Sequence, residues 1–190
     1  MAKKCCPADS ALKADKTCCS NGHERTSDNK VLVEYLYLDL QTCERCIGTD
    51  KVLDEVMMTL TPALQLAGYE IEYNKVKMET AELAKRYQFL SSPTIRINGR
   101  DVCLSVKENS CGCCSDISGT DVDCRVFEYK GENYEVPPKE MLAKAILCAV
   151  FGISEEACPC NSEYMLPGNL KTFFEGKRNK LSCCCGDKCC

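Results

Sequence analysis

The sequence predicts an α/β fold, a mixed central sheet with flanking helices, and three observations support this prediction. The segment 31–38 is a nearly unbroken apolar run rich in β-branched and aromatic residues, which is typical of a central strand buried on both faces. A helical pattern follows it, with Val52, Val56 and Leu60 at four-residue steps. Further strand and helix patterns then alternate in the order β-α-β-α-β-β-(insert)-α, which indicates a sheet covered by helices.

The elements that follow the first strand are each marked by a local signal. A helix is expected over about 46–67, with a kink at Pro62, because an internal proline removes one backbone hydrogen bond. Alternating apolar and polar residues predict a strand with one exposed face over 69–76. Thr80 is a suitable N-cap, so a short helix is expected over 81–87.

Two hairpins and a helix complete the predicted domain. Residues 94–97 have a strand pattern, and Asn98-Gly99 after them is a strong signal for a tight turn into the next strand. A second hairpin is expected at 126–136. Pro138 suits the start of a final helix that runs to about residue 151.

The chain of 190 residues is predicted to contain one domain with a cysteine-rich extension at each end. The N-terminal extension spans 1–30, and the domain spans 31–152 with a cysteine-rich insert at 103–124. The C-terminal tail, 153–190, is polar and is expected to have little structure without a ligand.

Cysteine usage predicts a reducing, cytoplasmic setting. The chain has 19 cysteines, an odd number, and its first residues lead into no apolar signal segment. Many cysteines are neighbours, and adjacent Cα atoms about 3.8 Å apart are too close for an ordinary disulfide, which needs about 4.4 Å. Such pairs suit thiolate binding of an ion. The net charge of −4 gives no reason to expect nucleic acid as a partner, and no apolar run is long enough to span a membrane.

Cys43 and Cys46 form a C-x-x-C motif where the first strand gives way to the first helix. The free N–H groups and positive dipole end of a helix stabilise an anion, so Cys43 is expected to ionise more readily than a free thiol. Cys46 is close enough in the chain to form a disulfide with it. The motif therefore predicts a dithiol–disulfide site, and the alternative is a structural or metal half-site.

The insert carries a second group of cysteines: Cys111, Cys113, Cys114 and Cys124, with Cys103 just upstream. Their sulfurs can reach one ion, and a site made only of thiolates prefers Zn(II), Cu(I), Hg(II), As(III) or an iron–sulfur cluster. A disulfide that braces the loop is the alternative. For Cys103, a residue inside a strand is the alternative to a ligand.

The two extensions carry the remaining candidate ligands. Their neighbouring thiols suit the same soft ions, and they could catch an ion and pass it to the core by ligand exchange. Nonspecific metal scavenging is the alternative. These candidates are Cys5, Cys6, Cys18, Cys19, Cys158, Cys160, Cys183, Cys184, Cys185, Cys189 and Cys190.

The order of elements, the C-x-x-C after the first strand and Ser92-Pro93-Thr94 at the third together resemble the thioredoxin fold over residues 31–152. The resemblance implies that Cys43 is the attacking thiol, Cys46 the resolving thiol and Pro93 a cis proline that contacts the substrate through its backbone. More narrowly, the chain is similar to an uncharacterised cysteine-rich thioredoxin-like family of bacteria and archaea. Its neighbouring cysteines also resemble those of arsenic metallochaperones, which deliver arsenite to an efflux ATPase.

Three departures from the thioredoxin pattern favour a specialised thiol function over a general protein-disulfide reductase. Typical thioredoxins have Trp before the first cysteine, where this chain has Thr42. They have Gly-Pro between the cysteines, where this chain has Glu44-Arg45. Tyr37 stands where those proteins have a buried Asp that assists proton transfer.

Three functions remain as hypotheses. The leading one is a cytoplasmic thiol protein that binds or transfers a soft metal or metalloid ion, such as arsenite or Hg(II), in detoxification, with a metal-efflux ATPase as a candidate partner. The second is a dithiol oxidoreductase in which Cys43 attacks and Cys46 resolves, with a thiol reductant as the electron donor. The third is metallothionein-like storage, with the fold as a carrier.

Overall fold

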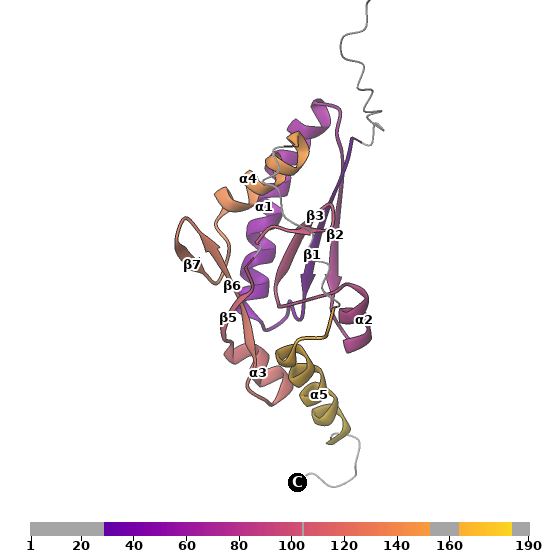
Figure 1. The fold of residues 1–190 in the computed structure, drawn as a ribbon, viewed down its shortest axis with the longest axis vertical. Helices are drawn as coiled ribbons and strands as arrows, with labels where there is room; N and C mark the ends of the chain where they lie inside the picture. The colour runs from indigo at the N-terminus through magenta and orange to yellow at the C-terminus, as the bar shows by residue number, and fades with distance from the viewer. Residues whose placement is uncertain (1–28, 104, 153–163, 184–190) are drawn as a thin grey trace, which may run out of the picture.

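The first sheet is built around the apolar strand β1, Lys30–Tyr37, in a computed structural model that describes residues 29–103, 105–152 and 164–183 (Figure 1). Strand β2, Glu70–Lys77, pairs with β1 in parallel, and β3, Thr94–Ile97, pairs with it on the other side in the antiparallel sense. The short strand β4, Arg100–Asp101, follows the turn at Asn98-Gly99 and gives the order β2-β1-β3-β4.

Both faces of β1 are covered, because alternate residues of a strand point to opposite sides. Val33 and Tyr35 pack in one core with α1, Glu44–Leu66, and α4, Lys139–Phe151, which lie side by side in Figure 1. Leu36 and Leu38 pack in a second core with the short helix α2, Ala81–Arg86, which Thr80 caps as the sequence predicts. Helix α1 begins at Glu44 and continues through Pro62 to Leu66, so it runs over nearly the predicted span.

The cysteine-rich insert contributes structure that the sequence did not predict. Strand β5, Lys107–Ser110, pairs antiparallel with β6, Asp123–Tyr129, and β7, Glu132–Tyr134, pairs with the other edge of β6. The predicted hairpin is therefore confirmed, but it belongs to a second sheet, β5-β6-β7. Between β5 and β6 the chain forms the helix α3, Gly112–Ser118.

The expectation of little structure in the C-terminal tail is wrong for helix α5, Gly168–Cys183. Leu170, Phe173 and Phe174 are buried in the same core as the cysteines of the insert, so burial of their side chains holds this helix in place. Helix α5 lies beside α3 at the lower end of the molecule (Figure 1). The two helices approach each other closely at Gly176 of α5, where an added Cβ would lie 2.5 Å from the carbonyl oxygen of Ser118 in α3.

A fully buried arginine joins the two sheets. The Arg125 guanidinium on β6 donates hydrogen bonds to Thr94 Oγ1 at 2.8 Å and to Asp101 Oδ2 at 2.6 Å, which belong to β3 and β4. It also donates to the carbonyl oxygen of Cys103 at 2.6 Å, and the Arg125 backbone N–H donates to the carbonyl of Ser92 at 2.7 Å. The insert is thus fixed against the first sheet at the end that carries the C-x-x-C motif.

Among the helices of the described residues, none combines the length and the apolar character that a membrane crossing needs. The predicted division of the chain at residues 30 and 152 stays a prediction.

Candidate metal centre

Four thiols from three separate elements meet at one point of the structure. Cys43 precedes α1, Cys111 and Cys114 belong to the start of α3, and Cys124 lies on β6. Their sulfur atoms all lie within 4.8 Å of one another, and each of the four residues is buried. The Sγ atoms of Cys43 and Cys114 are 3.7 Å apart, and those of Cys114 and Cys124 are 3.3 Å apart.

These distances fit a tetrahedral ion. Zn–S bonds of about 2.3 Å in tetrahedral geometry place neighbouring sulfurs about 3.8 Å apart. In this group, hereafter the four-thiol site, the Cys43–Cys114 sulfur separation of 3.7 Å matches that value, the Cys114–Cys124 separation of 3.3 Å is shorter, and no separation exceeds 4.8 Å. A donor set made only of thiolates selects soft or borderline ions over hard ones such as Mg²⁺ or Ca²⁺. The four cysteines could therefore hold one metal ion.

The loop before α1 is shaped to present Cys43. Asp39 Oδ2 accepts hydrogen bonds from the backbone N–H groups of Gln41 at 2.9 Å and Thr42 at 2.6 Å, and from Thr42 Oγ1 at 2.9 Å. Burial alone raises the pKa of Asp39, but these hydrogen bonds outweigh it and hold the pKa below its ordinary value. The ionised carboxylate thus fixes the turn that ends at Cys43, the N-cap of α1.

The insert brings its own three ligands together with local hydrogen bonds. Cys111 and Cys114 are three residues apart on the first turn of α3, so they share one face of the helix. The Cys111 backbone N–H donates to the carbonyl of Val122 at 2.9 Å, and the Val122 N–H donates to Ser115 Oγ at 2.9 Å. These bonds close the segment between α3 and β6, and Cys124 returns beside Cys114 two residues after Val122.

Arg45, inside the C-x-x-C motif, ties α1 to the insert. Its guanidinium donates to the carbonyl oxygens of Ser110 at 2.7 Å, Cys124 at 3.1 Å and Asn109 at 3.3 Å, and to Glu135 Oε1 at 2.7 Å. The side chain is nearly buried. Arg45 therefore joins the start of α1, next to Cys43, to the strand that carries Cys124.

The neighbouring thiols of this site shift one another's pKa. Hydrogen bonds from Cys114 and then Cys124 and Cys43 lower the pKa of Cys111, because they stabilise its thiolate. The same contact with Cys111 raises the pKa of Cys43 to about 12 and also raises the pKa of Cys124. The expectation that Cys43 ionises more readily than a free thiol is therefore wrong, because its thiol neighbours outweigh the helix dipole. Thiolates this close together repel one another, which disfavours ionising several of them at once. A bound cation would compensate the repulsion and allow them to ionise together.

Cys46 is not part of the four-thiol site. It is fully buried, and its Sγ lies 3.4 Å from Ser92 Oγ, in the residue before Pro93. A hydrogen bond with Cys43 and then burial raise the pKa of Cys46 above its ordinary value. The Ser92–Pro93 peptide bond is cis, as the family resemblance implied. Cys46 therefore contacts the residue before the cis proline rather than the four-thiol site.

The sequence-based prediction assigned the C-x-x-C motif and the insert to two separate sites. In the structure, one cysteine of the motif lies with three cysteines of the insert in a single site. The spacing Cys111-x-x-Cys114 is itself a second C-x-x-C, and this signal could have singled out two of the ligands. No disulfide joins the described cysteines. Cys113 is half-buried and faces a cavity, and Cys103 is buried with its Sγ 3.6 Å from Ser105 Oγ.

The candidates in the extensions cannot be placed in this way. Cys5, Cys6, Cys18, Cys19, Cys158, Cys160, Cys184, Cys185, Cys189 and Cys190 lie outside the described residues, and Cys183 ends α5.

The fold and the site together define a mixed α/β protein with a buried group of four thiols. Residues 31–146, more than half of the chain, match the family model of a domain of unknown function, DUF2703, and the chain belongs to this family. An uncharacterised protein of Archaeoglobus fulgidus is 32% identical over 110 residues, which cover 57% of this chain and 77% of that protein. No solved structure matches the chain.

Proposed function

We propose that this protein binds one soft metal or metalloid ion at Cys43, Cys111, Cys114 and Cys124. The observation that carries the proposal is the convergence of four buried sulfurs from distant parts of the chain to within 4.8 Å of one another. Thiols are only weak hydrogen-bond donors and acceptors, so hydrogen bonding among them gives little reason for four to converge. Four thiolates can instead bind one ion at the same time.

The number of ligands bears on the choice of ion. Four thiolates suit a tetrahedral ion such as Zn(II), whereas arsenite needs three, and Cu(I) and Hg(II) are also soft enough for the site. We propose transfer or detoxification of such an ion as the physiological role, in the reducing cytoplasm. The vicinal cysteines of the extensions support this role by their chemistry, and a metal-efflux ATPase is the proposed recipient.

A thioredoxin-like fold is part of the proposal. The sheet order β2-β1-β3-β4, with β1 and β2 parallel and β3 antiparallel to β1, supports it. So do the C-x-x-C at the start of α1 and the cis bond before Pro93, whose neighbour Ser92 contacts Cys46. The insert with its second sheet then supplies three ligands that this fold alone does not contain.

A dithiol oxidoreductase is the second candidate, because Cys46 adjoins Cys43 at the strand-to-helix junction beside cis-Pro93. Two observations weigh against it. Cys43 has no exposed surface, so a substrate disulfide cannot reach its sulfur directly. The pKa of Cys43 is raised to about 12, whereas an attacking thiol needs a lowered one. Cys46→Ser should trap a mixed disulfide if this candidate is correct.

The test is a metal titration of the reduced, anaerobic full-length chain in which the extension cysteines are replaced by serine. One Zn(II) or Hg(II) per chain is expected, and Cys114→Ser or Cys124→Ser should raise the dissociation constant by on the order of a hundredfold or more. Cys148→Ser, on α4 away from the site, is the matched control and should bind like the parent. Micromolar or weaker binding of zinc, mercury and arsenite alike would refute the proposal.

The extension cysteines test the storage hypothesis in the same experiment. If metallothionein-like storage is the function, the serine-substituted chain should lose most of its binding capacity while the unsubstituted chain binds several ions.

A further inference from the structure

Cys113 lies between two ligands of the four-thiol site in the sequence but does not belong to the site. Adjacent residues of a helix point about 100° apart, so Cys113 cannot share the face that Cys114 directs at Cys43. Its exposure differs accordingly, because Cys113 is half-buried whereas Cys111 and Cys114 are 4% and 0% exposed. The thiol is therefore within reach of solvent beside a site that is not.

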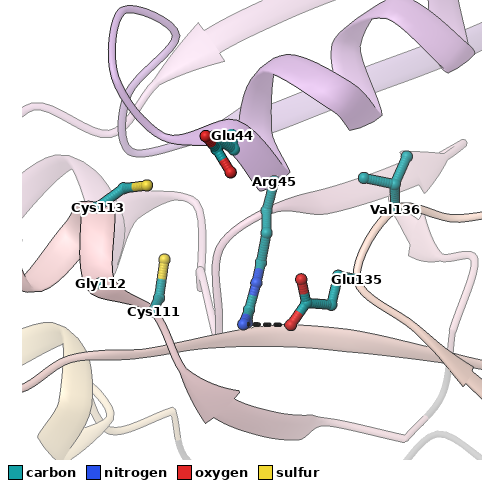
Figure 2. Close-up of a pocket in the computed structure, with 7 residues that line it drawn as sticks. All are labelled: Glu44, Arg45, Cys111, Gly112, Cys113, Glu135 and Val136. Atoms are coloured by element: carbon teal, nitrogen blue, oxygen red, sulfur yellow. Dashed lines mark hydrogen bonds and ion pairs between the residues drawn. The ribbon is translucent and has the colours of Figure 1, made fainter.

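A cavity of about 300 Å³ connects this thiol to the site. It is lined by Glu44, Arg45, Cys111, Gly112, Cys113, Glu135 and Val136. Figure 2 shows the sulfurs of Cys111 and Cys113 directed toward the same space, below the side chain of Glu44. Cys111 is also one of the four converging thiols, so a single residue belongs both to the cavity and to the buried site.

The charged groups around the cavity favour a cation. Glu44 and Glu135 contribute two carboxylates, whereas Arg45 contributes one guanidinium, which is already paired with Glu135 at 2.7 Å. An excess of negative charge in a concave site concentrates cations and repels oxyanions. A neutral oxyacid such as arsenous acid is not attracted by this negative charge.

We propose that Cys113 is a loading thiol, which captures a soft metal cation together with Cys111 and passes it to the four-thiol site. The inference rests on the proposed function and adds the route and the charge of the ion. In the first step, the sulfurs of Cys113 and Cys111 each form a bond to the ion, and two weakly held ligands, water or small thiols, leave. The proton of each thiol goes to a leaving ligand or to solvent.

In the second step, one buried thiol replaces Cys113 on the ion while Cys111 keeps its bond, and the other two buried thiols displace the weakly held ligands that remain. The proton of the thiol that replaces Cys113 passes to the released Cys113 sulfur, the other two protons go to the displaced ligands or to solvent, and the oxidation states of ion and sulfur stay unchanged. The exchange is therefore pure ligand substitution, and it predicts that Cys113 affects the rate of loading and leaves the final affinity unchanged.

Stopped-flow loading with Co(II) tests the inference, because thiolate-bound tetrahedral Co(II) absorbs visible light differently from the aqueous ion. The protein is the full-length chain with serine in place of the extension cysteines, reduced with a phosphine and kept anaerobic. Cys113→Ser should slow loading by about tenfold, since a tethered thiol raises the local ligand concentration. Its final spectrum and dissociation constant should equal those of the parent, which also shows that the variant folds.

Two further variants sharpen the test. Cys148→Ser removes a half-buried thiol on α4 and should load at the parental rate. Glu44→Gln should slow loading and weaken its dependence on salt, because it removes the steering charge but no sulfur.

Each other outcome has a definite meaning. If Cys113→Ser loads at the parental rate, the inference is wrong and the proposed function stands. If its final absorbance or affinity falls, Cys113 is a permanent ligand and the loading role is wrong. If the parent chain itself develops no thiolate–Co(II) spectrum, the loading role for a divalent cation is wrong, and the proposed function fails with it only if zinc, mercury and arsenite also bind at micromolar affinity or weaker.

Discussion

Arg45 shows how one side chain can hold a site together without touching an ion. Its guanidinium satisfies three backbone carbonyls and one carboxylate on the insert, and its side chain is 9% exposed. The Glu135 side chain is 57% exposed, so water screens the ion pair and limits its contribution. The carbonyl contacts are therefore expected to dominate the stabilising effect of Arg45.

Arg45→Met tests whether the carbonyl contacts stabilise the fold more than the ion pair does, because it keeps the length of the side chain and removes every hydrogen-bond donor. It should lower the free energy of unfolding by about 2–4 kcal/mol, since partly buried carbonyls lose their partners. Urea unfolding of the reduced chain measures the change. Glu135→Gln is the matched variant and should cost less than about 1 kcal/mol. Equal losses in the two variants would assign the stabilisation to the ion pair instead.

At the scale of elements, α5 covers one side of the four-thiol site. Leu170 and Phe173 are each 1% exposed and share a core with Cys111, Cys114 and Cys124. Lys180 Nζ adds a hydrogen bond of 2.5 Å to the carbonyl of Asp116 on α3. The helix from the tail is therefore part of the wall that keeps water from the sulfurs.

Phe173→Ala should weaken the packing of α5 on the four-thiol site and make the thiols more accessible to solvent. Removing a fully buried phenylalanine costs about 3–5 kcal/mol of stability and leaves a cavity next to the thiols. Alkylation of the four-thiol cysteines by iodoacetamide, followed by mass spectrometry, should become faster than in the parent. Met165→Ala, at an 81% exposed position, is the control and should leave both properties unchanged.

Gly176→Ala tests how closely α5 approaches α3. Alanine normally stabilises a helix interior by about 1 kcal/mol relative to glycine. At this position the new Cβ would lie 2.5 Å from a backbone oxygen of Ser118, so the melting temperature should fall. Gly168→Ala, in the same helix with nothing within 4 Å, should not lower it. A rise at both positions would mean that α5 and α3 are further apart.

For the molecule as a whole, the proposed ion binding would be coupled to protonation. The pKa of Cys43 is raised to about 12, so at neutral pH this thiol is protonated and an ion must displace the proton. Affinity should therefore rise with pH and fall as the solution is acidified. Calorimetric titrations with Zn(II) in buffers of different ionisation enthalpy should show net proton release, and an affinity independent of pH would contradict the thiolate assignment.

Much of the first sheet followed from sequence, because its signals are local. The apolar run of β1, the periodicity of α1 and α4 and the turn at Asn98-Gly99 each depend on neighbouring residues only. Helix α5 carries weaker signals, and its stability comes from Phe173 and Leu170 packing on an insert far away in the chain. The pairing of Cys43 with Cys111, Cys114 and Cys124 depends entirely on tertiary structure, so sequence identified the candidate thiols but not the set.

The distance along the chain between Cys43 and Cys111 has a mechanical consequence. A bond across a loop of about 70 residues removes enough freedom from the unfolded chain to stabilise the folded one by about 4 kcal/mol in the loop-entropy treatment of covalent bridges. An ion at the four-thiol site closes the same loop, but reversibly. With the ion in place, the insert could not separate from the start of α1. Once a chelator withdraws it, Arg45, Arg125 and the shared core would be left to hold the insert against the first sheet.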